Sequence, residues 1–257
     1  MNPTDDAKSP EAFYDELKSA FGAALARFKE RPELIGALCS IAFDAFESNI
    51  DAPRETPRQE NAPQLACRGD CPACCCLRVT VTAPEALLLA RFISANAQAF
   101  AERNIDLVGR ITATNAAVGS LPEAERMIAG RSCALLEGGF CAPYKLRPLA
   151  CRGHASFDAE ACAAATGGQN VDVPVSAEHI VLRGLVQSAM MSAMHETGLA
   201  SGLYELNRAV ALALATPEAP LLWAQGGDPL ARAKLAEAEQ SDPSAVFGGP
   251  GTGRGSL

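Results

Sequence analysis

Cysteine is concentrated in two short segments of this chain, and this pattern limits the fold more than any other feature. Eight of the ten cysteines lie between Cys67 and Cys151. Five of them fall between Cys67 and Cys76, and the others are Cys133, Cys141 and Cys151. A soft metal ion or an iron–sulfur cluster requires several thiolates that converge on one centre. The pattern therefore predicts a fold in which cysteine-bearing loops gather around an inorganic centre.

The composition is that of an ordinary globular protein with an acidic balance. At 257 residues the chain can form one large or two small domains, and 48% of its residues are hydrophobic. The net charge of −8 argues against broad binding to nucleic acid or anionic membranes. The first residues contain no apolar signal segment, and no window approaches the roughly 20 apolar residues of a membrane-spanning helix. We therefore expect a soluble, cytoplasmic protein, whose clustered cysteines bind metal in preference to forming disulfides.

The two cysteine segments are basic although the whole chain is acidic. Formal charges sum to +1 over residues 67–81 and to +3 over residues 131–152, within a chain of −8. Four thiolates on a divalent metal ion or on a four-iron cluster leave a net negative charge, which nearby cations stabilise. A chance fluctuation of a few charges is the alternative interpretation. The positive charge of the two cysteine segments modestly favours an iron–sulfur cluster over zinc as the cofactor.

Apolar periodicity predicts a mainly α fold, with helices packed around an irregular cysteine-ligated core and at most a short β segment over residues 77–81. Prolines among polar residues indicate a linker, and the glycine-rich end indicates a disordered tail. We expect five parts: an N-terminal helical pair (1–50), the linker (51–66), a cysteine-cluster metal-binding domain (67–165), C-terminal helices that pack on it (166–240) and the tail (241–257).

Capping patterns mark where some of these helices begin. Thr82 and Glu85 match a capping box directly after the first cysteine segment, so the helix that they open should pack against that segment. Ser120 and Glu123 repeat the pattern before a short helix that ends near Gly130. Further helices are expected over residues 10–28, 32–50, 105–118, 157–165, 177–197, 202–215 and 229–239.

Eight thiols are the candidate metal ligands. They would satisfy two tetrahedral sites, or one cluster and a second metal ion, while a single four-sulfur centre would leave several of them free. The sequence does not choose between these arrangements. Cys39 lies inside a predicted helix and is interpreted as a core residue. The candidate ligands are Cys67, Cys71, Cys74, Cys75, Cys133, Cys141, Cys151 and Cys162.

Three stretches combine into one composite motif: Cys67-x3-Cys71-x2-Cys74-Cys75, then Val79-Thr80-Val81-Thr82-x2-Glu85, then Cys133-x7-Cys141-Ala142-Pro143-Tyr144-x2-Arg147-Pro148-x2-Cys151-Arg152. With these residues, the region 65–165 resembles the YkgJ-type cysteine-cluster family, described as a zinc- or iron-chelating domain. The chain departs from the family pattern at Phe140 and in its additional Cys76. The resemblance implies binding of a metal or a cluster, and no particular reaction. Some flagellin lysine methylases are similar here, but the chain has no glycine-rich S-adenosylmethionine loop.

Three other residues of the second segment are candidate cofactor-binding residues. Arg147 and Arg152 could donate hydrogen bonds to cluster sulfurs or to carboxylates, or they could be surface residues of a basic loop. Tyr144 could cover the centre and restrict water, or it could fill the core. His154 lies three positions after Cys151, and we interpret it as a neighbour of the centre more readily than as a ligand.

These observations predict a protein that binds a metal or an iron–sulfur cluster and acts in metal handling or as a redox or sensory module. Metal ions are the expected partners, without nucleic acid or membrane. One alternative is an iron–sulfur-dependent enzyme that acts on a protein or a small molecule. The other is storage of copper by many thiolates. Met190, Met191 and Met194 with His195 could also bind Cu(I), although methionine at helical spacing more often fills a core.

Overall fold

The computed structural model describes residues 9–50 and 63–236. Most of the expected linker, the expected tail and the end of the helix expected at 229–239 lie outside these residues. The described residues are mainly helical, as predicted, with two small two-stranded sheets. None of the described helices is both long and apolar enough to cross a membrane.

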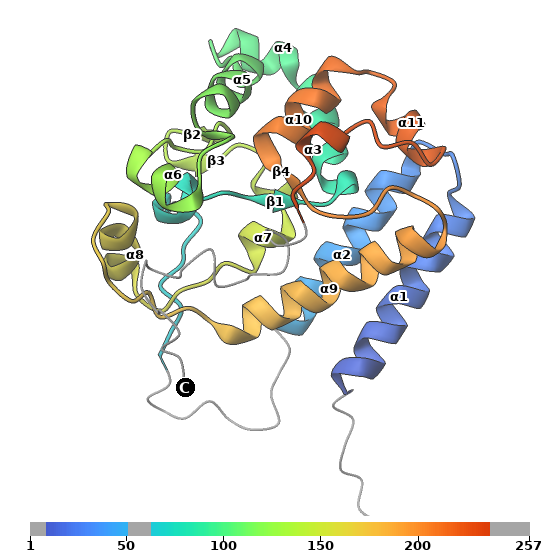
Figure 1. Cartoon of the computed structure of the whole chain (residues 1–257), viewed down its shortest axis with the longest axis horizontal. Helices are drawn as coiled ribbons and strands as arrows, with labels where there is room; N and C mark the ends of the chain where they lie inside the picture. The colour runs from blue at the N-terminus through green and yellow to red at the C-terminus, as the bar shows by residue number, and fades with distance from the viewer. Residues whose placement is uncertain (1–8, 51–62, 237–257) are drawn as a thin grey trace, which may run out of the picture.

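A bundle of three long helices forms one side of the molecule (Figure 1). It consists of α1 (Pro10–Arg27), α2 (Glu33–Ile50) and α9 (Ala177–Glu196), and α9 packs against both of the others. Ser9 caps α1, because its side chain accepts a hydrogen bond from the backbone N–H of Ala12 at 3.2 Å. The hydroxyl of Tyr14 on α1 donates to Ser192 on α9 at 2.8 Å. The first and last thirds of the chain are thus joined directly.

A second group of helices covers the other face of α2. It consists of α3 (Ala83–Ala95), α10 (Leu206–Ala215) and α5 (Leu107–Val118), with α10 packed between the other two. The strand β1 (Thr80–Val81) pairs antiparallel with β4 (Tyr204–Glu205), so the chain after the first cysteine segment is attached to the start of α10. The short β segment near residues 77–81 is therefore confirmed. Its partner β4 was not predicted, and it takes the place of the first residues of the helix expected over 202–215, which begins only at Leu206.

Shorter elements complete the fold. A hairpin of β2 (Leu136–Glu137) and β3 (Phe140–Cys141) and three short helical elements carry six of the ten cysteines. These are the 3₁₀ turn η1 (Ala73–Cys76), α7 (Leu149–Arg152) and α8 (Ala159–Thr166). The remaining elements are α4 (Ala97–Glu102), α6 (Glu123–Ala129), η2 (Tyr144–Leu146), α11 (Ala219–Ala224) and η3 (Ala231–Ala233).

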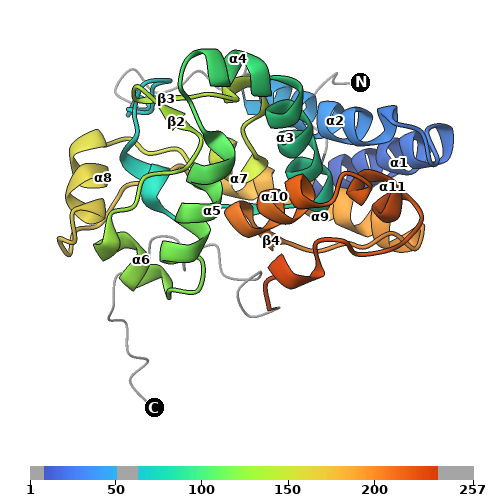
Figure 2. The ribbon, with the colours of Figure 1, turned by 90° about the horizontal axis from the view of Figure 1, so that it is seen from above.

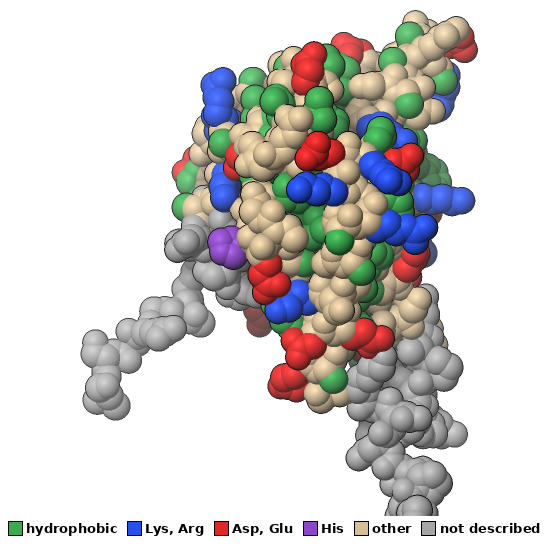
Figure 3. Space-filling model, turned by 90° about the vertical axis from the view of Figure 1, so that its right-hand side faces the viewer, with side chains coloured by type: hydrophobic (Ala, Val, Ile, Leu, Met, Phe, Trp, Pro, Cys, Tyr) green, Lys and Arg blue, Asp and Glu red, His purple; other side chains and the backbone are tan. Residues whose placement is uncertain are grey.

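One continuous hydrophobic core joins the helices from both ends of the described chain. Phe21 of α1, Leu38 of α2, Leu89 of α3, Met190 of α9 and Trp223 of α11 all belong to it and are almost fully buried. On the face shown in Figure 3, acidic and basic side chains are interspersed among apolar ones. The hairpin of β2 and β3, which contains Cys141, and helix α8 lie at one end of the molecule, and α1 and α11 lie at the other (Figures 1 and 2).

Two predictions about helix limits are wrong. Over its described part, the segment from Pro229 forms only the 3₁₀ turn η3, and the backbone N–H of Leu235 donates to the carbonyl of Leu203 at 2.9 Å instead of continuing a helix. The capping box at Ser120 is not formed, although α6 ends at Gly130 as expected. The carboxylate of Glu123 accepts a hydrogen bond from the backbone N–H of Arg78 at 2.9 Å instead.

Candidate metal centre

The first cysteine segment forms tight turns that lead into the short 3₁₀ turn η1. The backbone N–H of Cys71 donates to the carbonyl of Arg68 at 3.1 Å, and that of Cys75 donates to the carbonyl of Pro72 at 2.9 Å. Pro72 directly precedes η1, which excludes a continuous helix through this segment. Cys74, Cys75 and Cys76 are therefore presented by one turn of 3₁₀ helix.

The second cysteine segment is shaped by a hairpin and by α7. Gly138 and Gly139 adopt φ values of +57° and +88° at the tip of the hairpin, where L side chains are disfavoured, and the returning strand places Cys141 opposite Leu136. Pro148 then precedes α7, which carries Cys151. Cys133, Cys141 and Cys151 are all half-buried. They come from the loop before the hairpin, from its returning strand and from α7.

The buried carboxylate of Glu85 connects the start of α3, which follows the first cysteine segment, to the second cysteine segment. Glu85 forms the predicted capping box, since its Oε2 accepts from the backbone N–H and the hydroxyl of Thr82 at 2.7 and 2.8 Å. Its other oxygen accepts from the backbone N–H of Leu149 at 2.7 Å, at the start of α7. The same side chain therefore fixes the start of α3 and the helical turn that contains Cys151.

The two cysteine segments lie against each other. The backbone N–H of Cys133 donates to the carbonyl of Cys75 at 2.7 Å. The sulfur of Cys67 accepts from the backbone N–H of Ser156 at 3.2 Å, and the backbone N–H of Ala66 donates to the carbonyl of Ser156 at 2.9 Å. Helix α8, which contains Cys162, packs against η1. Segments that are far apart in sequence are therefore held together by backbone hydrogen bonds.

Electrostatic interactions divide the thiols into two groups that are linked through Cys74. Burial raises the pKa of Cys151 well above its usual value, and interactions with Cys133, Cys74 and Cys141 raise it further. We call Cys74, Cys133, Cys141 and Cys151 the inner thiol set. Burial also raises the pKa of Cys162, which interacts with Cys67, Cys74 and Cys71. We call Cys67, Cys71 and Cys162 the outer thiol set.

The thiols of the inner set are protonated at neutral pH in the protein alone. A side-chain hydrogen bond with Cys75 and burial raise the pKa of Cys74 far above its usual value, and burial raises the pKa of Cys133 to about 11. Among the described residues, no group of three or more His, Cys, Asp or Glu side chains is already arranged to hold a metal ion. A metal ion would therefore have to displace thiol protons and draw the sulfurs together.

Three arginines approach the thiols, and each has an Nε atom that is buried without a hydrogen-bond partner among the described residues. Burial raises the pKa of Cys141, and the guanidinium of Arg147 opposes that shift. Arg126 has the same opposing effect on Cys133. Burial lowers the pKa of Arg183, and Cys151 opposes this shift. Buried N–H donors beside sulfur fit an anionic thiolate centre, because its sulfurs would accept those hydrogen bonds.

Two of the three predicted cofactor-binding residues lie near the first segment, and the third faces elsewhere. The guanidinium of Arg147 stacks on the ring of Tyr144, 4.1 Å from its centroid. A Cβ atom at Gly69 would lie 3.6 Å from that ring, which is partly exposed. Arg152 instead pairs with the carboxylate of Glu47 on α2, and the thiol with which it interacts is that of the core residue Cys39.

The other candidates are divided between the site and the core. His154 is half-buried beside Arg183, and burial followed by that charge lowers its pKa to about 4. Cys39 is buried in α2 as predicted, with only 1% of its surface exposed. Met190 and Met194 are fully buried in the core, as the core interpretation of the methionines requires. Arg126 and Arg183 were missed because they lie on α6 and α9, outside the two cysteine segments.

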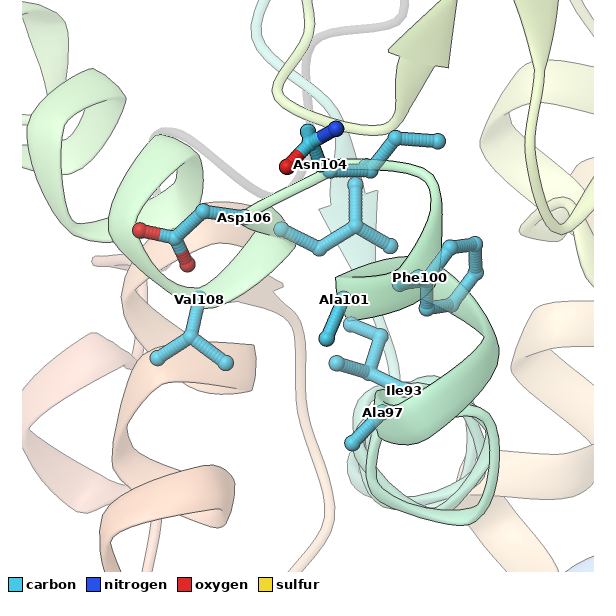
Figure 4. Close-up of a pocket in the computed structure, with 9 residues that line it drawn as sticks. Ile93, Ala97, Phe100, Ala101, Asn104, Asp106 and Val108 are labelled. Carbon is cyan, nitrogen blue, oxygen red and sulfur yellow. The ribbon is translucent and has the colours of Figure 1, made fainter.

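A separate cavity of about 430 Å³ contains no cysteine in its lining. It lies between the end of α3, the short α4 and the start of α5 (Figure 4). Ile93, Phe100 and Val108 give it an apolar wall, and Asn104 and Asp106 add polar groups. The cavity is therefore a feature distinct from the thiols.

Comparison with known proteins gives no match. No family model fits the chain, and neither a curated protein nor a solved structure matches it. The resemblance to the YkgJ-type family accordingly rests on the motif residues alone and stays a hypothesis.

Proposed function

We propose that this protein binds a thiolate-ligated metal or iron–sulfur centre, with ligands from both cysteine segments. The observation that carries the proposal is the contact between these segments, in which the backbone N–H of Cys133 donates to Cys75 at 2.7 Å. The interactions of Cys151 with Cys74, Cys133 and Cys141 support it further, because such interactions occur between thiols that lie near one another.

The inner thiol set supplies the ligands in this proposal. Its four sulfurs match the number that a tetrahedral zinc ion or a four-iron cluster takes from a protein. Such a centre, when bound, would supply either structural cross-linking or electron transfer. The chain's own contribution is to hold the sulfurs in half-buried surroundings and to place cationic donors beside them.

An iron–sulfur cluster is modestly preferred over zinc in this proposal. Arg126, Arg147 and Arg183 all have electrostatic interactions with thiols of the inner set. N–H donors beside cluster sulfurs are a recognised means of tuning a reduction potential. A redox or sensory role follows from a cluster, and metal handling or structural stabilisation follows from zinc. The outer thiol set, with exposed Cys67, would serve as a second thiol group at the surface.

The test begins with the full chain purified without oxygen. A broad absorption band near roughly 400 nm, with iron and acid-labile sulfide, is expected for a cluster, whereas bound zinc leaves the protein colourless. Cys141→Ser and Cys151→Ser should each lose at least about half of the bound metal per chain, because each removes a sulfur of the inner set.

Cys39→Ala is the matched control, because Cys39 is a core cysteine of the same chain. It should keep the full metal content. Failure of the wild-type chain to retain iron, zinc or copper, even after reconstitution, would refute the proposal. Many copper ions per chain would instead support thiolate storage.

A further inference from the structure

Arg147 and Arg183 reach the thiols from separate parts of the chain. Arg147 lies between η2 and α7, and its guanidinium is held against the ring of Tyr144 at 4.1 Å. Arg183 lies on α9 and passes directly over the backbone of Gly153. A Cβ atom at Gly153 would lie only 2.6 Å from the Cβ and Cδ atoms of Arg183, so this approach requires glycine. The fold therefore positions both guanidiniums specifically.

Neither guanidinium has a carboxylate partner among the described residues. The ion pairs there include Arg126 with Glu205 at 3.4 Å and Arg152 with Glu47, but none that contains Arg147 or Arg183. The Nε atoms of Arg147 and Arg183 are also buried without a hydrogen-bond acceptor in that part of the chain. Arg126 differs from both, because Glu205 compensates its charge.

A half-buried cation without a counter-ion is unfavourable, since the buried part of the guanidinium loses its hydration and gains no anion in return. The neighbouring thiols do not compensate the charge while they are protonated, because a neutral thiol is only a weak acceptor. Two guanidiniums held in this way beside sulfur imply that their acceptor is an anion. Four thiolates around a divalent metal ion, or around an oxidised four-iron cluster, form a dianion.

We propose that Arg147 and Arg183 are the two counter-cations of a dianionic, all-thiolate centre formed by the inner thiol set, and that they determine which centre the protein accepts. This inference rests on the proposed function. The inference extends that function, because it gives two residues outside the ligand set a role in determining which metal centre binds. A centre in which a neutral His154 replaced one thiolate would carry one negative charge fewer and would leave one guanidinium uncompensated. The two arginines thus favour four sulfur ligands.

Replacement of either arginine by methionine tests the inference through two measurements, the affinity for Cd²⁺ and the thermal midpoint, which should change in opposite directions. Arg147→Met and Arg183→Met keep an apolar side chain of similar length and remove the charge. The binding of Cd²⁺ to the reduced full chain, measured by competition with a chelator, should weaken at least about tenfold. The thermal midpoint of the same chain without metal should rise by about 2 °C or more, because an uncompensated buried cation is lost.

Arg68→Met is the matched control, and Arg183→Lys tests the role of charge. Arg68 lies in the first cysteine segment but is exposed and paired with Asp70 at 3.4 Å, so neither measurement should change. Arg183→Lys keeps the charge and loses the planar donor group, and it should bind Cd²⁺ with an affinity between those of wild type and Arg183→Met.

The outcomes separate this inference from the function on which it rests. A wild-type chain that binds neither Cd²⁺ nor a reconstituted iron–sulfur cluster would overturn both. A wild-type chain that binds Cd²⁺ while both methionine variants bind it equally well would overturn the inference alone. A lower thermal midpoint for the metal-free variants would show that the arginines stabilise the fold itself, which also contradicts the inference.

Discussion

Four arginines near the cysteine segments differ in whether a carboxylate compensates them. Glu47 pairs with Arg152 and Glu205 pairs with Arg126, whereas the guanidinium of Arg147 stacks on an aromatic ring. A count of charges along the sequence treats such residues alike. It predicted a basic surrounding for the thiols, but it did not separate the arginine that binds α2 from the arginine that faces sulfur. That distinction depends on tertiary contacts.

His154 makes the stability of the protein depend on pH. Its pKa is about 4 in the folded chain, because of burial and then of Arg183, against an ordinary value of 6.5. The unfolded chain therefore binds a proton first as the pH falls. Stability is complete above pH 6.5 and decreases between pH 6.5 and pH 4, by about 3 kcal/mol. His154→Gln should remove this part of the loss.

Urea denaturation of the metal-free wild type and His154→Gln between pH 7 and about pH 4 measures the difference. The difference between the two proteins isolates the histidine, because carboxylates titrate in both. Parallel curves for the two proteins would contradict the assignment.

Local and long-range interactions explain which caps the sequence predicts correctly. Thr82 and Glu85 are three residues apart and form their capping box as the pattern predicts. Ser120 and Glu123 have the same spacing, but the carboxylate of Glu123 binds the backbone of Arg78, which is 45 positions away. The spacing of residues in the sequence predicts the local hydrogen bonds between Thr82 and Glu85, but not the long-range one between Glu123 and Arg78.

At the scale of elements, α7 is held against α2 by Arg152. The side chain of Arg152 pairs with Glu47, donates to the backbone carbonyls of Arg147 and Lys145 at 2.9 and 2.6 Å, and lies 4.1 Å from the ring centroid of Phe43. These contacts fix the loop that enters the helical turn of Cys151. Arg152 is therefore best explained as a support of the second segment.

Arg152→Lys should lower the free energy of unfolding by about 1–3 kcal/mol, because one ammonium group cannot replace a planar guanidinium with several partners. Arg91→Lys is the control, since Arg91 is exposed and, within residues 9–50 and 63–236, donates only to the carbonyl of Pro32 at 3.2 Å. It should change stability by less than about 0.5 kcal/mol.

Urea denaturation gives both stabilities, and metal analysis of the same samples gives the content per chain. A loss of metal from Arg152→Lys without a loss of stability would place Arg152 at the centre itself, contrary to the structure.

The long helices were the predictable elements, and the short ones were not. The apolar periodicity of α1, α2 and α9 is sustained over four or more turns, so their predicted limits agree closely with the structure. The six-residue helices α4 and α11 are too short to show a period and were not predicted. Strand β4 has two residues, and only its pairing with β1 identifies it.

At the scale of the whole molecule, the hydrophobic core and the thiols occupy different regions. Met190 and Met194 lie in the core, whereas the cysteine-bearing α8 and hairpin lie at one end (Figure 2). The sequence predicted that both cysteine segments would contribute to one region. It could not predict that α9, far along the chain, would add Arg183 to it.

Met190→Ala separates a core role for the methionines from copper binding. Because Met190 is fully buried, the substitution should lower the free energy of unfolding by about 2–5 kcal/mol. The metal content per chain should stay at the wild-type value. Denaturation in urea and metal analysis after growth with added copper give the two results, and reduced copper binding with unchanged stability would contradict the core assignment.

Glu85 has a consequence for how inherited variation in this protein would be interpreted. One carboxylate receives hydrogen bonds from Thr82 and from the start of α7, so its replacement would disturb a helix start and the surroundings of Cys151 together. A harmful allele at this position would disturb the surroundings of Cys151 while leaving every cysteine codon intact.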